Sequence, residues 1–310
     1  MRIGIVEPDG FDPQTRALLE TLGPVACYDG GDWHAFAADR EALFVRLRRR
    51  IDRSFLAPAR QLRYLVSPTT GHTHIDEAEL AARGVRLLSL RGERSFLAGV
   101  RATPEHIVGL TLALLRRYKD AFLHAGNPVW DRDRYRGQEL CGSLVGLIGF
   151  GRIGSRLAAY LAAFGAETAF YDPDSAVQAC CGAQRVDSLS ELIASAAIVI
   201  VCASYRAGDA PPIGADLLAA MAGKYLINAA RGELIDEEAL IGLLEKGHFA
   251  GVALDVIADE TGPDNRLARL LSLTATTNLI VTPHIGGATV QSMAATERFL
   301  AAKLAEAWRA

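Results

Sequence analysis

The chain has 310 residues, half of them hydrophobic, and a formal net charge of −3. This length and composition are sufficient for the cores of two domains, and the charge argues against a nucleic-acid-binding protein, in which basic residues cluster. No apolar stretch approaches the roughly 20 residues of a membrane span, and the N-terminus has no signal-peptide segment. The five cysteines are odd in number and lack a C-x-x-C pair, which argues against a disulfide framework or a structural zinc site. We therefore expect a cytoplasmic protein with reduced thiols.

The N-terminal part alternates short strands with helices, a pattern typical of parallel sheets. Strands are expected at residues 2–6, 25–28, 43–47, 63–66 and 85–88, and helices at residues 11–22 and 75–83. The basic run at residues 46–50 indicates a solvated edge or helix end, although it could instead attract an anionic substrate. These elements predict a smaller α/β domain of about 95 residues.

A long helix is expected next, at residues 103–118, with Thr103 as its N-cap and Pro104 in its first turn. A second α/β region follows. Its expected strands are residues 143–148, 168–171, 197–202, 224–228, 251–255 and 279–281, and helices are expected at residues 188–195, 214–221 and 237–246. The tail, residues 290–310, has apolar side chains at helical spacing and predicts an amphipathic helix that could fold back onto the N-terminal domain.

The strongest motif is Gly149-Phe150-Gly151-Arg152-Ile153-Gly154, a G-x-G-x-x-G pattern between a strand and an Ala/Leu-rich helix. Gly149 permits the tight turn, Gly151 lets the backbone approach a pyrophosphate, and Gly154 lets the helix pack closely on the sheet. The helix N-terminus, at Arg152 and Ile153, presents free N–H groups and a partial positive charge to the phosphates. The segment therefore predicts a dinucleotide-binding βαβ unit.

Asp172 ends the second strand of this unit, about twenty residues after the glycines. Its carboxylate can accept hydrogen bonds from both hydroxyls of an adenosine ribose, whereas its charge would repel a 2′-phosphate. No Lys or Arg follows before Arg185. The sequence therefore favours NAD over NADP as the cofactor.

Polar residues follow three further strands of the same predicted sheet. Arg231 ends the segment Asn228-Ala229-Ala230-Arg231, Asp255 is followed by Glu260, and His284 lies between Pro283 and two glycines. Because ligands bind at the carboxyl ends of strands in open α/β sheets, these side chains should converge on the nicotinamide end of a bound dinucleotide.

The three candidate catalytic residues match the needs of hydride transfer between NAD and a 2-hydroxy acid. His284 is a suitable base for the hydroxyl proton. Arg231 is suited to bind the carboxylate and polarise the carbonyl, since guanidinium is planar and always charged. Glu260 can hold the base in place and stabilise its protonated form. This chemistry needs no metal, and no spacing of His, Asp and Glu suggests one.

Together these segments resemble the D-isomer-specific 2-hydroxyacid dehydrogenase family. The match rests on VGLIGFGRIG (145–154), YDP (171–173), LINAARGELIDEEAL (226–240), GVALDV with the later Glu260 (251–260), and TPHIGGAT (282–289). The family's catalytic Arg, Glu and His motifs fall on Arg231, Glu260 and His284. The resemblance further implies cofactor contacts by Thr103, Cys202, Ala203, Ala229, Asp255, His284 and Gly286.

The N-terminal match is looser, and there Thr70, Gly71 and His72 occupy the place of the family loop that holds the substrate carboxylate. The resemblance implies two Rossmann-like α/β domains with parallel sheets. Residues 1–97 and 288–310 would form the substrate-binding, flavodoxin-like domain, and residues 98–287 would form the inserted NAD-binding domain. The substrate would lie in the cleft between them, and a homodimer is implied by resemblance alone.

The sequence therefore predicts an NAD-dependent oxidoreductase that interconverts a D-2-hydroxy acid and its 2-oxo acid. Two alternatives stay open. One is a non-catalytic, NAD-sensing scaffold similar to the corepressor members of the family, and the other is a dehydrogenase of the same fold that acts on formate or phosphite. Neither the acid nor the physiological direction follows from the sequence.

Overall fold

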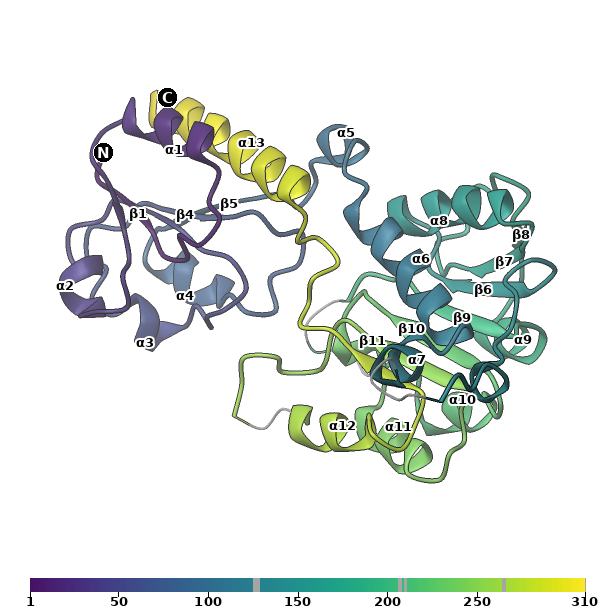
Figure 1. Cartoon of the computed structure of the whole chain (residues 1–310). Helices are drawn as coiled ribbons and strands as arrows, with labels where there is room; N and C mark the ends of the chain where they lie inside the picture. Colours follow the sequence, from purple (N-terminus) through teal and green to yellow (C-terminus); the bar gives the residue numbers. More distant parts are fainter. Residues whose placement is uncertain (125–128, 206–207, 209–210, 264–265, 310) are drawn as a thin grey trace. The chain divides into compact units, whose positions relative to one another are not determined.

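A computed structural model describes residues 1–124, 129–205, 208, 211–263 and 266–309, and Figure 1 shows its helices and strands. The chain falls into two compact units. Unit 1 holds the residues up to Val100, residues 261–263 and the chain from Gly287 on, whereas unit 2 holds the residues from Arg101 to Glu260 and the stretch that ends at Gly286. Both units are built on parallel sheets, as the strand–helix alternation predicts.

Unit 1 contains a five-stranded parallel sheet in the order β2-β1-β3-β4-β5. The strands are short and apolar: β1 (Ile3–Ile5), β2 (Val25–Cys27), β3 (Ala42–Phe44), β4 (Tyr64–Ser67) and β5 (Arg86–Ser89). The helices between them are α1 (Pro13–Glu20), α2 (Trp33–Ala37), α3 (Arg53–Leu56), α4 (Glu77–Ala82) and α5 (Arg94–Leu97), and the C-terminal helix is α13 (Val290–Arg309). The last residue of the expected tail helix, 310, lies outside the described residues.

Two apolar layers cover the faces of this sheet. Leu19 of α1 and Leu300 and Leu304 of α13 pack with Ile3 and Phe44 on one face, while the opposite face packs on α2, α3 and α4. The C-terminal helix thus covers one face of the N-terminal sheet. The Tyr64 hydroxyl of that sheet donates a hydrogen bond to the carbonyl of residue 307 at 2.9 Å. Burial of the apolar stripe of α13 explains why the tail belongs to this unit.

Unit 2 contains a seven-stranded parallel sheet in the order β12-β11-β10-β9-β6-β7-β8. Its strands are β6 (Leu144–Ile148), β7 (Glu167–Tyr171), β8 (Gln184–Arg185), β9 (Ile198–Val201), β10 (Tyr225–Asn228), β11 (Gly251–Leu254) and β12 (Leu279–Val281). The central strands are buried on both faces, as expected of a parallel sheet. All seven carboxyl ends therefore lie along one edge of the sheet.

Helices cover both faces of this sheet (Figure 1). On one face lie α6 (Ala102–Leu115) and α8 (Arg152–Ala163), and their apolar residues pack with Ile198 and Ile200 of β9. The other face, with Val199 and Val201, packs on α9 (Leu189–Ser195), α10 (Ala215–Ala219) and α11 (Glu237–Leu244). The remaining helical segments of unit 2 are α7 (Tyr118–His124), α12 (Leu267–Leu273), η1 (Asp133–Tyr135) and η2 (Gly232–Leu234).

Aspartates start many of the helices, because a carboxylate can accept hydrogen bonds from first-turn amides that have no intrahelical partner. Asp12 caps α1 at Thr15 N (2.9 Å), and Asp236 caps α11 at Ala239 N (3.1 Å). Asp32, Asp52 and Asp76 play the same part at α2, α3 and α4. These caps fix where each helix begins relative to the strand before it.

The long helix after unit 1 differs from its expected form. It begins one residue earlier than expected, with Arg101 at the N-cap position, so the expectation that Thr103 is the N-cap is wrong. It also ends at Leu115 rather than residue 118, because Arg117 has a φ of +53° and breaks the helical path before α7 begins. Among the described residues, no helix is both long and apolar enough to cross a bilayer.

Candidate active site

The glycine turn lies at the carboxyl ends of β6 and β9, two adjacent strands of unit 2. Gly149 has a φ of +91°, a conformation that glycine adopts without strain. A Cβ on Gly149 would lie 2.7 Å from Ala203 Cα, so the turn packs directly on the residues that follow β9. Strand order reverses between β6 and β9, and this is the position at which ligands bind in open α/β sheets.

The other two glycines of the motif have different surroundings. A Cβ on Gly154, in the first turn of α8, would lie 2.4 Å from the Gly149 carbonyl oxygen, so the helix can approach the turn only because this residue is glycine. A Cβ on Gly151 would meet nothing within 4 Å. Gly151 is the N-cap of α8 and supplies no side chain to cap the first turn of the helix. A helix start of this kind, next to a glycine turn, is suited to a phosphate group.

Asp172 is joined to the same turn, because its carboxylate accepts hydrogen bonds from Phe150 N (2.7 Å) and Asp174 N (3.0 Å). Each carboxylate oxygen has further lone pairs for ribose hydroxyls. Arg185 is the first basic residue after Asp172, and its guanidinium donates to the carbonyls of Asp172, Asp174 and Val177 at 2.9 to 3.0 Å. These bonds commit the Arg185 guanidinium to backbone carbonyls and not to a 2′-phosphate, which is consistent with NAD as the cofactor rather than NADP.

His284 and Glu260 are in direct contact. His284 Nδ1 lies 2.8 Å from Glu260 Oε2. An ionised carboxylate can only accept, so Nδ1 carries the shared proton and Nε2 is left for a reacting hydroxyl. Both side chains are partly exposed, at 22% and 29%, which leaves the imidazole accessible to a small molecule.

The buried carboxylate of Asp255 fixes the backbone around His284. It accepts hydrogen bonds from Ile285 N and Gly286 N, both at 2.8 Å, and from the Thr282 hydroxyl at 2.6 Å. Burial alone would raise the pKa of Asp255, but these bonds and the contact with His106 outweigh it and lower that pKa. Asp255 is therefore ionised at neutral pH, and Gly286 must be glycine because a Cβ there would lie 2.9 Å from Asp255 Oδ2.

Arg231 follows β10 in a segment braced by Asn228, whose side chain donates to the Arg231 carbonyl (2.8 Å) and accepts from Ala230 N (3.0 Å). Burial lowers the pKa of the Arg231 guanidinium, whereas the negative charges of Glu260 and Glu233 raise it. Guanidinium stays charged even so. Arg231 thus lies within electrostatic reach of Glu260, and the three candidate catalytic residues gather in unit 2.

His106 belongs to this cluster, although the sequence did not single it out. It projects from α6, and its Nε2 lies 3.2 Å from Asp255 Oδ1 and 3.4 Å from the Thr282 hydroxyl. The sequence feature that could have indicated His106 is the polar pair Glu105-His106 near the start of a helix that is otherwise mostly apolar. Thr103, one turn earlier, lies near Gly286, because a Cβ added to Gly286 would be 3.4 Å from the methyl carbon of Thr103.

The other expected cofactor residues lie at the same edge of the sheet. Cys202 and Ala203 follow β9, and Ala229 follows β10 and is buried. Burial raises the pKa of the Cys202 thiol to about 12. The thiol therefore stays protonated near neutral pH and has no role as a nucleophile.

The expected substrate loop lies in unit 1, after β4. Thr70 is exposed and Gly71 half-buried, whereas His72 is buried with its Nδ1 3.1 Å from Glu77 Oε1. The His72 ring is therefore held inside unit 1, and the loop can offer its backbone more readily than this side chain.

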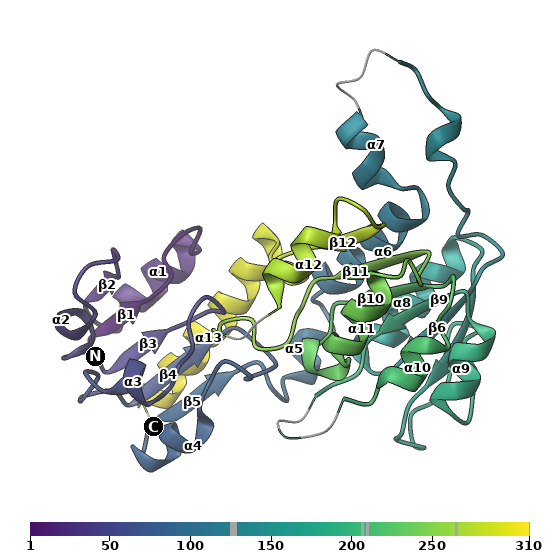
Figure 2. The same ribbon diagram turned by 90° about the horizontal axis from the view of Figure 1, so that it is seen from below.

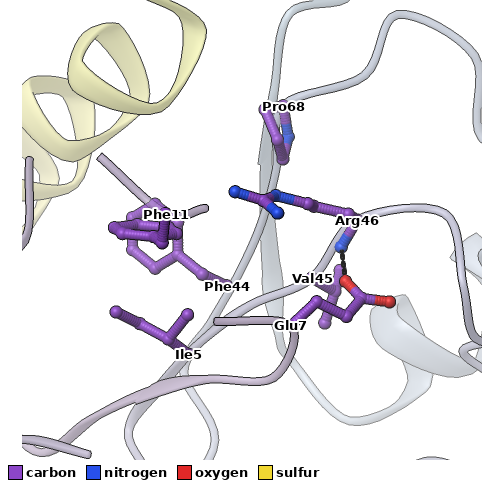
Figure 3. A pocket seen from close by; sticks show the side chains of 7 residues that line it. All are labelled: Ile5, Glu7, Phe11, Phe44, Val45, Arg46 and Pro68. Atoms are coloured by element: carbon purple, nitrogen blue, oxygen red, sulfur yellow. Dashed lines mark hydrogen bonds between the residues drawn. The ribbon is translucent and has the colours of Figure 1, made fainter. Parts of the chain in front are cut away.

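The basic run that follows β3 makes contacts within unit 1. Arg46 pairs with the buried Glu297 of α13 and donates to the carbonyl of Asp9 at 2.8 Å. Figure 3 shows its side chain near Phe11 and Pro68, with the Glu7 carboxylate bonded to its backbone nitrogen. Arg48 is exposed and pairs with Asp9. The run is a loop and not a helix end, and the strand expected at residues 43–47 ends at Phe44.

Part of unit 2 matches a known protein family. Residues 108–286 match the model of the NAD-binding domain of D-isomer specific 2-hydroxyacid dehydrogenases, which identifies this part of unit 2 as an NAD-binding domain. The D-3-phosphoglycerate dehydrogenase of Mycobacterium tuberculosis H37Rv is 32% identical over 290 residues, which cover 92% of this chain and 53% of that protein. This chain thus spans about half the length of several of its curated relatives.

A second relative is matched over most of its length. The glyoxylate reductase of Thermofilum pendens is 31% identical over 290 residues, which cover 89% of this chain and 83% of that protein. Among solved structures, D-lactate dehydrogenase from Aquifex aeolicus, complexed with NAD and lactic acid, has the same fold, with a TM-score of 0.83, 24% identity, and coverage of 99% of this chain and 95% of that one.

Proposed function

Because the chain belongs to the D-isomer-specific 2-hydroxyacid dehydrogenase family, we propose that it is an NAD-dependent oxidoreductase that interconverts a D-2-hydroxy acid and its 2-oxo acid. The observation that carries this proposal is the 2.8 Å contact between His284 and Glu260 at the sheet edge that also bears the glycine turn. An acid–base pair beside a cofactor site is what hydride transfer to or from a 2-hydroxy acid requires.

Each residue has a defined role in this proposal. When bound, NAD supplies the hydride acceptor. His284 Nε2 takes the hydroxyl proton as the substrate is oxidised and returns it in the reverse direction, while Glu260 stabilises the protonated ring and fixes its orientation. Arg231 binds the substrate carboxylate and polarises the carbonyl. Asp255 orients the His284 loop, and Thr70, Gly71 and His72 are retained as proposed contributors to substrate binding.

The cofactor would be held by the turn and by the strand ends around it. The amides at Arg152 and Ile153 would bind the pyrophosphate, Gly151 would allow its close approach, and Asp172 would bind the adenosine ribose. Thr103, Cys202, Ala203, Ala229 and Gly286 would line the nicotinamide side.

We also propose that the chain forms a homodimer through α7 together with Val129 and Trp130. Figure 2 shows α7 standing away from the sheet of unit 2. Phe122, Leu123, Val129 and Trp130 are 70%, 80%, 62% and 97% exposed. Large apolar groups with this much exposure favour burial against a second copy of the chain.

A substrate screen tests the proposed activity. Absorbance of NADH would be followed with glyoxylate, pyruvate and a phosphorylated 2-oxo acid, which represent the acids of the related enzymes, and in the oxidative direction with the D-hydroxy acids, formate and phosphite. We expect turnover of a 2-oxo acid, and we expect His284→Ala to lose about two to four orders of magnitude in kcat while still binding NADH.

Two results would contradict the proposal. NADH binding without consumption across the whole panel would favour an NAD-sensing scaffold. Oxidation of formate or phosphite alone would show that the protein is a dehydrogenase of the same fold with a different substrate. Near-full activity of His284→Ala would remove the proton-transfer role from this residue.

A further inference from the structure

Glu237, the first residue of α11, is a carboxylate in an unusual place. It is only 6% exposed, although glutamate is rarely buried without a partner. Its Oε1 accepts a hydrogen bond from the amide of Ala258, whereas in the described part of the chain its buried Oε2 has no hydrogen-bond partner. Burial raises the pKa of Glu237, and the Ala258 bond opposes that shift. Helix capping does not account for this residue, because Asp236 already caps α11.

The bond partner of Glu237 lies on the segment that carries Glu260. Ala258 is two residues before Glu260, in the stretch that leaves β11. The neighbouring backbone is held just as closely, because a Cβ on Gly232 would lie 1.9 Å from the carbonyl carbon of Ile257. The segment with Arg231 and the segment with Glu260 are thus in backbone contact, and Glu237 is the side chain that joins them by a hydrogen bond.

We propose that Glu237 is a positioning residue, whose bond to Ala258 holds residues 258–260 so that the Glu260 carboxylate meets His284 Nδ1. Its effect on turnover rests on the proposed dehydrogenase function, but its effect on the His284–Glu260 contact does not. Within the part of the chain that the structure describes, Glu237 makes no hydrogen bond to Glu260 or His284, so its influence passes through the backbone of residues 258–260.

Three variants of Glu237 that differ in side-chain length and in the presence of a hydrogen-bond acceptor separate a positioning role from a general effect on protein stability. Glu237→Leu keeps the volume but removes the acceptor, Glu237→Asp keeps the charge but is one methylene too short, and Glu237→Gln keeps an acceptor at the same reach. We expect kcat to fall at least tenfold in the Leu and Asp variants and to stay within about threefold in the Gln variant, with the Kd for NADH unchanged in all three. Glu238→Gln is the matched control, since Glu238 is the next residue of α11, is exposed and pairs with Arg266 and Arg269.

Two further measurements exclude a merely structural role. In the Glu260→Gln background, Glu237→Leu should cost little more turnover, because the contact that it supports is already lost. Proton NMR of the His284 Nδ1–H gives a readout that needs no substrate. This hydrogen-bonded signal should shift or vanish in Glu237→Leu and Glu237→Asp and persist in Glu237→Gln and Glu238→Gln.

The outcomes are distinguishable. An unchanged Nδ1–H signal in folded Glu237→Leu and Glu237→Asp, or equal losses in the Gln variant and the Leu variant, would overturn the positioning role. If the Leu variant does not fold, the Asp variant decides in its place. Absence of turnover in the unaltered protein would count against the proposed function alone, because the NMR signal would still report whether Glu237 holds the contact.

Discussion

His284 has a φ of +54°, a left-handed conformation that costs a residue other than glycine about 1 to 2 kcal/mol. The surrounding bonds hold it there: His284 N donates to the Asp255 carbonyl at 2.8 Å, and the Asp255 carboxylate accepts from the next two amides. Such strain persists where the surrounding structure over-determines it, commonly at functional sites. We infer that the loop is shaped to aim the imidazole.

Asp255 gives a pH-dependent prediction at this scale. Its pKa is lowered in the folded protein, so its contribution to stability is present above the unfolded-state pKa of about 3.9 and is lost as the pH falls through the lower folded value. Asp255→Asn should therefore reduce the free energy of unfolding by about 2 kcal/mol at pH 7. The difference between the two proteins should shrink as the pH falls below about 4.

Urea unfolding at a series of pH values measures this difference. Asp174→Asn is a suitable control, because Asp174 is exposed. A constant difference between Asp255→Asn and the unaltered protein from pH 7 to pH 3 would show that the charge of Asp255 contributes nothing.

The candidate site was predictable from sequence where its residues follow strands. Arg231, Glu260 and His284 each lie after a strand of one parallel sheet, and such strands share their carboxyl edge. His106 was not predictable in this way, since it lies on a helix and not after a strand, and no repeating pattern of polar residues in that helix points to it. Glu237 was also missed, because the sequence of an amphipathic helix does not reveal that one of its acids is turned inward.

At the scale of elements, the glycine turn and α8 allow a matched prediction. Gly151 has a negative φ and open space at its Cβ position, so Gly151→Ala should leave stability within about 0.5 kcal/mol of the unaltered protein. It should nevertheless weaken NADH binding at least tenfold, because a methyl group would occupy the approach to the pyrophosphate. Gly154→Ala should instead lower stability by about 1 to 3 kcal/mol, since its Cβ would lie 2.4 Å from a backbone oxygen.

Fluorescence titration with NADH and urea unfolding of both variants would check this pair. The assignment of the two glycines would be wrong if Gly151→Ala were the less stable protein, or if it bound NADH as tightly as the unaltered chain.

Longer elements were predicted better than short ones. Apart from β8, which was not expected, the strands of both sheets lie within a few residues of their expected positions, as do helices such as α4, α9 and α11. The helices α2, α3 and α5 were missed, since four or five residues form a single turn and show no periodicity. Asp32 and Asp52 were usable signals for two of them, because each aspartate caps the turn that follows.

At the scale of the whole molecule, the strand–helix alternation predicted two parallel sheets, and the amphipathic tail predicted a helix that packs on the N-terminal sheet. No comparable pattern in the sequence predicted the exposed apolar groups near α7. Large apolar side chains are ordinarily buried within their own domain, whereas the structure shows that Phe122 and Leu123 of α7 and the later Trp130 are exposed.

These exposed groups lead to a prediction about assembly. If they are buried between two copies of the chain, the unaltered protein should have a solution mass near twice 33.2 kDa by light scattering. Phe122→Glu combined with Trp130→Glu should shift the mass toward that of one chain, because two charges would have to be buried in the interface.

Phe164→Glu, at an exposed apolar residue that follows α8, should leave the mass unchanged. A dimer that survives the paired substitution would place the interface on another surface, and a monomeric unaltered protein at micromolar concentration would remove the proposed dimer altogether.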